Sequence, residues 1–127
     1  KLTFPDRTVV AFAGDGCFMM NGQELATAAQ YGAHIIVVVV NNSMYGTIRM
    51  HQERNYPGRV SATELVNPDF VALGAAYGGY SELVTSTEQF APAFERARTA
   101  GRPALIEVRL DKEVISHNTT LSALRDR

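Results

Sequence analysis

Two polar segments, each directly after an apolar run, carry the residues that could bind a metal ion and a phosphate group. Gly14-Asp15-Gly16 follows the first run, and Asn41-Asn42 follows the second. Ligands of an open α/β sheet bind outside the carboxyl ends of its strands, where these segments would lie. Asp15 offers a carboxylate and Asn42 a carboxamide oxygen, both hard ligands of the kind that Mg²⁺ takes together with phosphate oxygens. The pattern indicates a divalent cation and the diphosphate that it neutralises.

The charge of Asp15 explains why a metal is needed. This carboxylate would repel a diphosphate unless a cation lay between them. We expect Gly14 and Gly16 to let the backbone turn sharply and approach a ligand closely. The amides of residues 16–18 can then point at phosphate oxygens, and the irregular stretch at residues 43–46 can supply a backbone carbonyl to the metal.

Two short apolar runs must position these segments. Residues 8–13 are apolar and β-branched, and residues 35–40 are apolar without alternation, which is typical of strands covered on both faces. We expect both strands to lie centrally in a parallel sheet. Small and apolar residues at helical spacing predict a crossover helix over residues 20–31. The fold class is therefore α/β, with a mainly parallel sheet and helices on both faces.

The rest of the chain continues this alternation up to residue 110. We expect a helix with Asn67 as its N-cap, a strand, a second helix that starts with a capping box of Ser86 and Gln89, and a last strand. The predicted ranges of these four elements are 68–77, 80–84, 87–100 and 104–110.

The C-terminal residues 111–127 are expected to form an arm or tail. The sequence becomes polar beyond Asp111, and residues 116–120 predict a loop whose order depends on a neighbour. The domain that carries the candidate site is therefore expected to span residues 1–110.

Composition and charge exclude several classes of function. The chain has 127 residues, 46% of them apolar, and a formal net charge of -1, so it has no bulk electrostatic attraction to nucleic acid. The apolar run at residues 35–40 is too short to cross a bilayer, and we expect no membrane association. A single cysteine allows no disulfide within the chain and fits a reducing compartment, so we expect a cytoplasmic protein.

The two polar segments resemble the binding motif of thiamin-diphosphate-dependent enzymes, in which GDG is followed by a spacer and then by NN. The sequence that contains them, GDGCFMMNGQELATAAQYGAHIIVVVVNNSMYGTIR, is similar to the cofactor domain of the acetolactate synthase, benzoylformate decarboxylase and pyruvate oxidase group. The resemblance implies a C-terminal diphosphate-binding domain over residues 1–110 with the thiamin-diphosphate-binding fold. It makes the side chains of Asp15 and Asn42 and the carbonyl of Met44 the protein ligands of Mg²⁺. The cofactor-binding residues that it implies are Gly14, Asp15, Gly16, Cys17, Asn42, Met44, Tyr45, Gly46 and Thr47.

The same resemblance implies an enzyme, a lyase or a transferase, that acts on 2-oxo acids. Such an enzyme decarboxylates its substrate and either releases an aldehyde or ligates the enamine to a second carbonyl. Its family forms homo-oligomers, dimers or tetramers, in which a pyrimidine-binding domain on a partner subunit supplies the activating carboxylate. No catalytic residue is therefore assigned in this chain. Because the chain starts at Lys1 without methionine, we expect it to be a piece of a longer polypeptide and inactive when isolated.

One question about the reaction and two alternative functions remain open at this point. Residues 44–49 read Met-Tyr-Gly-Thr-Ile-Arg and differ from the Leu-Gly-Met pattern of acetolactate synthases, which puts acetolactate synthesis itself in question. The domain could be a non-catalytic or split-subunit module that binds the cofactor for another chain. It could also be a flavodoxin-like domain that binds a different phosphate ligand without metal, and this alternative gives Asn42 no role.

Several residues also have purely structural interpretations. Asp15 could merely fix a turn, and Asn41 is expected to satisfy backbone groups in its own turn rather than to bind metal. Cys17 is expected to act through its backbone amide, because no base for its thiol is evident.

A group of basic side chains follows the second polar segment. They could form a lid that attracts a carboxylate substrate, but a solvated surface is the interpretation that we favour. These residues are Arg49, His51, Arg54 and Arg59.

Overall fold

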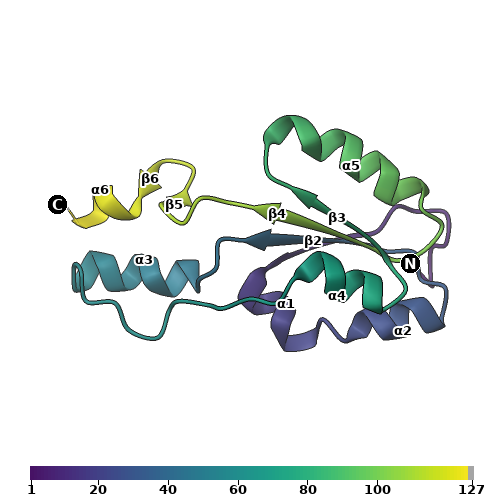
Figure 1. Cartoon of the computed structure of the whole chain (residues 1–127), viewed down its shortest axis with the longest axis horizontal. Helices are drawn as coiled ribbons and strands as arrows, with labels where there is room; N and C mark the ends of the chain where they lie inside the picture. Colours follow the sequence, from purple (N-terminus) through teal and green to yellow (C-terminus); the bar gives the residue numbers. More distant parts are fainter. Residues whose placement is uncertain (126–127) are drawn as a thin grey trace.

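The computed structural model describes residues 1–125, in which strands and helices alternate along most of the chain (Figure 1). The strands of the main sheet are β1 (Val10–Gly14), β2 (Ile36–Asn41), β3 (Tyr80–Val84) and β4 (Ala104–Arg109). The helices are α1 (Asp15–Asn21), α2 (Glu24–Gln30), α3 (Gly46–Asn55), α4 (Phe70–Ala76), α5 (Thr87–Thr99) and α6 (Leu121–Arg125). Two further short strands are β5 (Val114–Ser116) and β6 (Thr119–Thr120).

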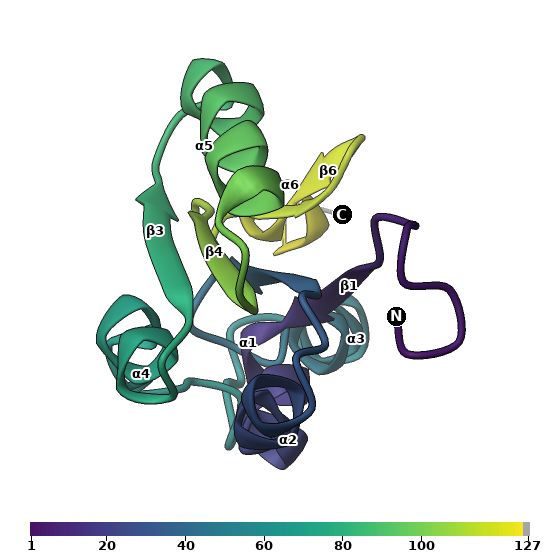
Figure 2. The same cartoon turned by 90° about the vertical axis from the view of Figure 1, so that its right-hand side faces the viewer.

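The four long strands form one parallel sheet in the order β1-β2-β4-β3. Helices cover both faces, with α5 on one side and α1, α2 and α4 on the other (Figure 2). Strand β2 shows why its run is continuously apolar: Ile36 and Val38 pack in the cluster under α5, whereas Val37 and Val39 pack in the cluster with Phe18 and Phe70. The predicted fold class is confirmed.

The position of β1 differs from the prediction. It was expected to lie centrally, but it pairs only with β2, and within residues 1–125 no strand pairs with its outer edge. Phe12 on this strand is 71% exposed. An apolar run marks a strand whose side chains can be buried, but it does not state which chain segment buries them.

The crossover region is helical, but it starts earlier than predicted and is divided in two. Helix α1 begins at Asp15, directly after β1, and α2 follows after a break at residues 22–23. At Gly22 a Cβ would come within 2.8 Å of the Phe18 ring, so the glycine at this break leaves room for the buried Phe18 side chain. The glycines around Asp15 were predicted to form a sharp turn, and that prediction was wrong for Gly16, which lies inside α1.

Both predicted helix caps differ in detail from the structure. The N-cap of α4 is Asp69, whose Oδ1 accepts a hydrogen bond of 2.9 Å from the Ala72 amide. Asn67 was the predicted cap, and its side chain is instead directed at the candidate site. At α5, Ser86 makes no capping bond with its side chain, and Gln89 Oε1 accepts from the Thr85 amide at 2.8 Å.

The segment beyond residue 110 contains regular structure where a loop was predicted. Strands β5 and β6 form a small antiparallel pair, and α6 lies beside α3 at the carboxyl end of the sheet (Figure 1). Leu121 and Leu124 of α6 are buried, and α6 packs against α3. The last two residues of the predicted arm, 126–127, lie outside the described residues.

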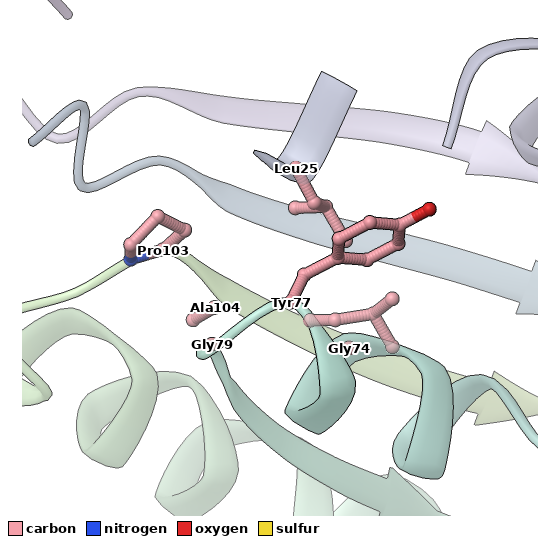
Figure 3. Close-up of a pocket in the computed structure, with 7 residues that line it drawn as sticks. Leu25, Gly74, Tyr77, Gly79, Pro103 and Ala104 are labelled. Carbon is pink, nitrogen blue, oxygen red and sulfur yellow. The ribbon is translucent and has the colours of Figure 1, made fainter. Parts of the chain in front are cut away.

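Helix α4 packs closely on the sheet because Gly74 faces β3 and β4 (Figure 3). An added Cβ would lie 2.3 Å from Ser81 Oγ and 3.1 Å from Leu105 Cβ. The serine hydroxyl can rotate away, whereas the Leu105 Cβ moves only with its backbone. Gly74→Ala is therefore expected to destabilise the protein by about 1–2 kcal/mol, because overpacking outweighs the gain in helix propensity. Urea denaturation measures this change. Ala75→Gly in the same helix calibrates the propensity term, and a Gly74→Ala variant more stable than the parent would contradict the close packing.

Candidate metal and diphosphate site

A cavity of about 440 Å³ opens at the carboxyl ends of β1 and β2. All nine residues that the sequence predicted to bind the cofactor line it: Gly14, Asp15, Gly16, Cys17, Asn42, Met44, Tyr45, Gly46 and Thr47. The cavity is also lined by apolar residues that were not singled out, including Ile48, Leu110 and Ile115. The two polar segments, which are far apart in the sequence, therefore meet at one concave site.

Asp15 is a buried carboxylate without a cationic partner. Asp15 is only 2% exposed to solvent. Its Oδ1 accepts from the Gly16 amide at 2.9 Å and its Oδ2 from the Asn67 side-chain amide at 2.7 Å. No ion pair in residues 1–125 includes this residue. Burial of a charge is costly unless it is paired or coordinates a metal, so this position favours a bound cation.

Asn42 and Met44 approach from the turn after β2. Asn42 Oδ1 accepts from the Met44 amide at 3.3 Å, and Ser43 between them adopts a left-handed backbone conformation with φ of 55°. The segment 43–45 pairs with residues 63–65. The Leu65 amide donates to the Ser43 carbonyl, and the Tyr45 amide donates to the Thr63 carbonyl. In this antiparallel pattern the peptide groups of Met44 face the other way, on the side of Asn42. The Met44 carbonyl is thus available on that side, as a metal ligand must be.

Helix N-termini meet at this cavity. Helix α1 begins at Asp15 and α3, which has ten residues, begins at Gly46. The first amides of a helix have no partner within the helix, and the helix dipole places partial positive charge there. This arrangement suits the oxygen atoms of a phosphate group.

Gly16 is required by space rather than by backbone conformation. It lies inside α1, so the sharp turn predicted there is not seen. A Cβ at this position would lie 2.5 Å from Tyr45 Cε1 and 2.9 Å from Tyr45 Cδ1. The Tyr45 ring therefore packs directly on the Gly16 backbone at the cavity. Gly14 has an extended conformation with φ of -67° and likewise needs no left-handed backbone.

Two functional candidates were missed by sequence reasoning. Asn67 donates hydrogen bonds to both Asp15 and Asn41, and Asn41 donates one to the buried Glu107. Glu107 was detectable in principle, since a carboxylate stands within the otherwise apolar run of β4. Asn67 was noticed but was assigned to a helix cap. For Asn41 the prediction held: its Oδ1 accepts from the Ser43 amide at 3.0 Å, within its own turn.

The basic residues do not line the cavity, and Arg49 is not solvated as the favoured interpretation predicted. Arg49 is 4% exposed and forms an ion pair with the buried carboxylate of Glu53. The other three, His51, Arg54 and Arg59, are exposed as predicted. Arg49 therefore belongs to the packing of α3.

The carboxylate of Glu53 in α3 forms an ion pair with Arg125 of α6. Arg125 donates to Glu53 Oε2 through Nε at 3.0 Å and to Oε1 through Nη2 at 2.9 Å. The Gly58 amide donates to Oε2 at 2.9 Å. The Arg125 bonds, then the Gly58 and Arg49 contacts, outweigh desolvation and lower the pKa of Glu53 to about 2. Because α3 starts at the cavity, this ion pair network holds one wall of the site.

Two further features are absent from the part of the chain that the structure describes. Within residues 1–125, no group of three or more His, Cys, Asp and Glu side chains is arranged to hold a metal ion. In the same part of the chain no helix combines the length and the apolar character needed to cross a bilayer. A metal at the cavity would therefore have one carboxylate and neutral oxygen ligands from this domain.

Comparison with known proteins decides the family. The model of the family described as thiamine pyrophosphate enzyme, C-terminal TPP binding domain, matches residues 1–108. The chain belongs to this family. A curated relative of this TPP-binding domain is the acetolactate synthase large subunit of Corynebacterium glutamicum. The two are 42% identical over 113 residues, which cover 84% of this chain and 18% of the relative.

Solved structures agree with this assignment. The thiamine diphosphate-dependent 4-hydroxybenzoylformate decarboxylase of Rhodococcus jostii RHA1 is 34% identical with a TM-score of 0.79, over 87% of this chain and 21% of that one. Benzoylformate decarboxylase from Polynucleobacter necessarius is 31% identical with a TM-score of 0.79, over 88% of this chain and 21% of that one. The TPP-binding domain thus spans about a fifth of the length of the proteins that it matches.

Proposed function

We propose that this domain binds thiamin diphosphate through Mg²⁺. In this proposal the side chains of Asp15 and Asn42 and the carbonyl of Met44 hold the metal, and amides at the starts of α1 and α3 hold the diphosphate. The observation that supports it most strongly is the buried Asp15 carboxylate, which lacks a cationic partner among the described residues and lines the same cavity as Asn42 and Met44.

The donor set fits magnesium rather than a softer metal. A carboxylate, a carboxamide oxygen and a peptide carbonyl are hard oxygen ligands, and Mg²⁺ is usually bound by one or two carboxylates together with substrate phosphates. The diphosphate would bring the remaining negative charge. Cys17 also lines the cavity, but nothing in the proposal requires its thiol.

We further propose that the complete enzyme decarboxylates a 2-oxo acid and either releases an aldehyde or ligates the product to a second carbonyl compound. Bound thiamin diphosphate supplies the nucleophilic carbon and the electron sink for this chemistry. The residues of this chain hold and orient the cofactor. The activating carboxylate is assigned to a pyrimidine-binding domain, on a partner subunit of a homo-oligomer. Relatives named as acetolactate synthase and as 4-hydroxybenzoylformate decarboxylase support a 2-oxo acid substrate and both fates of the product.

Calorimetric titration of thiamin diphosphate tests the proposal. The protein is the assembled enzyme, meaning this domain together with the pyrimidine-binding domain that completes its site. Binding is expected with excess Mg²⁺ and is expected to be lost when EDTA removes the metal. Equal affinity under the two conditions would contradict the proposed role of Asp15.

Two alternatives differ from the proposal in measurable ways. A flavodoxin-like domain binds its phosphate ligand without a metal, and membership of the TPP-binding family argues against it. A module that binds the cofactor for another chain would bind it with Mg²⁺ in the same titration, but an assembly of this protein without that separate chain would not consume any 2-oxo acid. Carbon dioxide release from a panel of aliphatic and aromatic 2-oxo acids distinguishes this module from an enzyme.

A further inference from the structure

Asn67 connects the Asp15 carboxylate to a second polar group. Its Nδ2 donates to Asp15 Oδ2 at 2.7 Å and to Asn41 Oδ1 at 3.0 Å. Asn67 lies between α3 and α4, so it reaches the carboxylate from a segment outside the two motif segments. Both hydrogen atoms of its amide group are therefore used, one on each acceptor.

The network continues from Asn41 to the sheet. Asn41 Nδ2 donates to Glu107 Oε1 at 2.8 Å, and Arg109 Nη2 donates to the same oxygen at 3.1 Å. Asn41 is 6% exposed and Glu107 is 3% exposed, although Arg109 reaches solvent. Together with Asn67, these residues also line a second cavity of about 690 Å³. The network thus lies between this polar cavity and the candidate cofactor site.

The chemistry of the end groups fixes the direction of every bond in this network. Arg109 can only donate and is bonded to Glu107 Oε1, so this oxygen is an acceptor and Asn41 must turn its NH₂ group toward Glu107 and its oxygen toward Asn67. The Ser43 amide, which can only donate, is bonded to the same Asn41 oxygen at 3.0 Å and enforces the same orientation. Asn67 must then present its NH₂ group, and this group reaches Asp15.

We propose that Asn67 is a positioning residue for the metal ligand Asp15 and that Asn41 and Glu107 orient it. This inference rests on the proposed magnesium-dependent binding of thiamin diphosphate. The Asn67 bond and the Gly16 amide each engage one oxygen of Asp15, so the carboxylate is held in one orientation before the metal arrives. Partners of this kind around a metal ligand commonly change metal affinity by 10–100-fold.

Four variants in the assembled enzyme test the inference. Asn67→Ala removes the donor to Asp15, and Asp69→Ala is its matched control, because it removes the cap of α4 two residues away and leaves the network intact. Glu107→Leu removes the acceptor for Asn41. Glu107→Gln is the conservative variant, since the donor-only Arg109 keeps a glutamine oxygen facing Asn41.

The main measurement is the Mg²⁺ concentration that gives half-maximal binding of thiamin diphosphate in calorimetry. We expect this concentration to rise about tenfold in Asn67→Ala and Glu107→Leu, and to change less than about twofold in Asp69→Ala and Glu107→Gln. A merely structural role of Asn67 would lower the thermal midpoint without changing this concentration, and that result would overturn the inference. Asn67 is half-buried and lies outside the helices and strands, so Asn67→Ala still tests the inference if Glu107→Leu fails to fold.

The design separates this inference from the function on which it rests. If the parent enzyme binds thiamin diphosphate equally well with and without Mg²⁺, both the proposed function and the inference are overturned. Magnesium-dependent binding in the parent with an unchanged Asn67→Ala variant would overturn only the inference.

Discussion

Asp15→Ala is expected to abolish the magnesium-dependent part of thiamin diphosphate binding. The carboxylate is the charged protein ligand in the proposed site, and it is 2% exposed at the cavity beside Asn42 and Met44. Loss of an outer partner of a metal ligand already costs about 10–100-fold in affinity, so removal of the ligand itself should cost about a hundredfold or more. Calorimetry of the assembled enzyme with Mg²⁺ and with EDTA measures the affinity for thiamin diphosphate with and without the metal.

Two further variants serve as comparisons for Asp15→Ala. Asp6→Ala removes an exposed carboxylate outside the cavity and should bind as the parent does. Asp15→Asn keeps the shape but removes the charge and replaces one acceptor oxygen by an NH₂ group, so it should weaken magnesium binding and should also lose the hydrogen bond from Asn67 or from the Gly16 amide. An Asp15→Ala variant that retains full magnesium dependence would show that another group holds the metal.

Glu53→Gln is expected to destabilise the protein by about 3 kcal/mol. The Glu53 carboxylate is 1% exposed and is bonded to Arg125 and Arg49, so the neutral side chain would leave the buried Arg49 guanidinium with only the longer 3.8 Å contact to the exposed Glu64 as an ion pair. Removal of one partner from a buried ion pair typically costs 3–5 kcal/mol. Since α3 forms one wall of the cavity, cofactor affinity should fall as well. Urea denaturation and calorimetry report the two effects.

The difference in unfolding free energy between the parent and Glu53→Gln should depend on pH, and this dependence provides a specific control. The pKa of Glu53 is lowered from 4.5 to about 2 by the hydrogen bond from Arg125 and the other contacts, so its stabilisation is complete above pH 4.5 and is lost as the pH falls toward 2. The parent and Glu53→Gln should therefore converge in stability between pH 4.5 and 2. A difference that stays constant over this window would contradict the ion pair network as its source. Other carboxylates titrate in both proteins and cancel in the comparison.

Most of the fold could be predicted from local patterns, and the errors have physical reasons. The run at residues 35–40 predicted a strand covered on both faces because each of its two sides packs in a separate apolar cluster. The similar run before Asp15 gave an edge strand instead, since a sequence pattern shows that a strand can be buried but not which segment buries it. The helix near the C-terminus could not be predicted because α6 packs against α3, which is a contact between distant segments.

The candidate site was predictable where the ligand atoms come from the motif itself. Asp15, Asn42 and Met44 line one cavity because β1 and β2 are adjacent parallel strands that end at the same edge. Asn67 was misassigned because Asn before Pro is also a common helix start, and only the tertiary structure shows that its amide is taken by Asp15 and Asn41. The role of Gly16 was likewise missed, because the Tyr45 ring that needs the space comes from another segment.

The central claim is that a divalent cation at this edge of the sheet joins Asp15, Asn42 and Met44 to a diphosphate. The most direct measurement is the anomalous diffraction of Mn²⁺ in crystals of the assembled enzyme grown with thiamin diphosphate. We predict one peak in the cavity, about 2.0–2.3 Å from a carboxylate oxygen of Asp15, the amide oxygen of Asn42 and the carbonyl of Met44. A diphosphate bound in the cavity with no metal between it and Asp15, or a metal bound elsewhere, would contradict the claim.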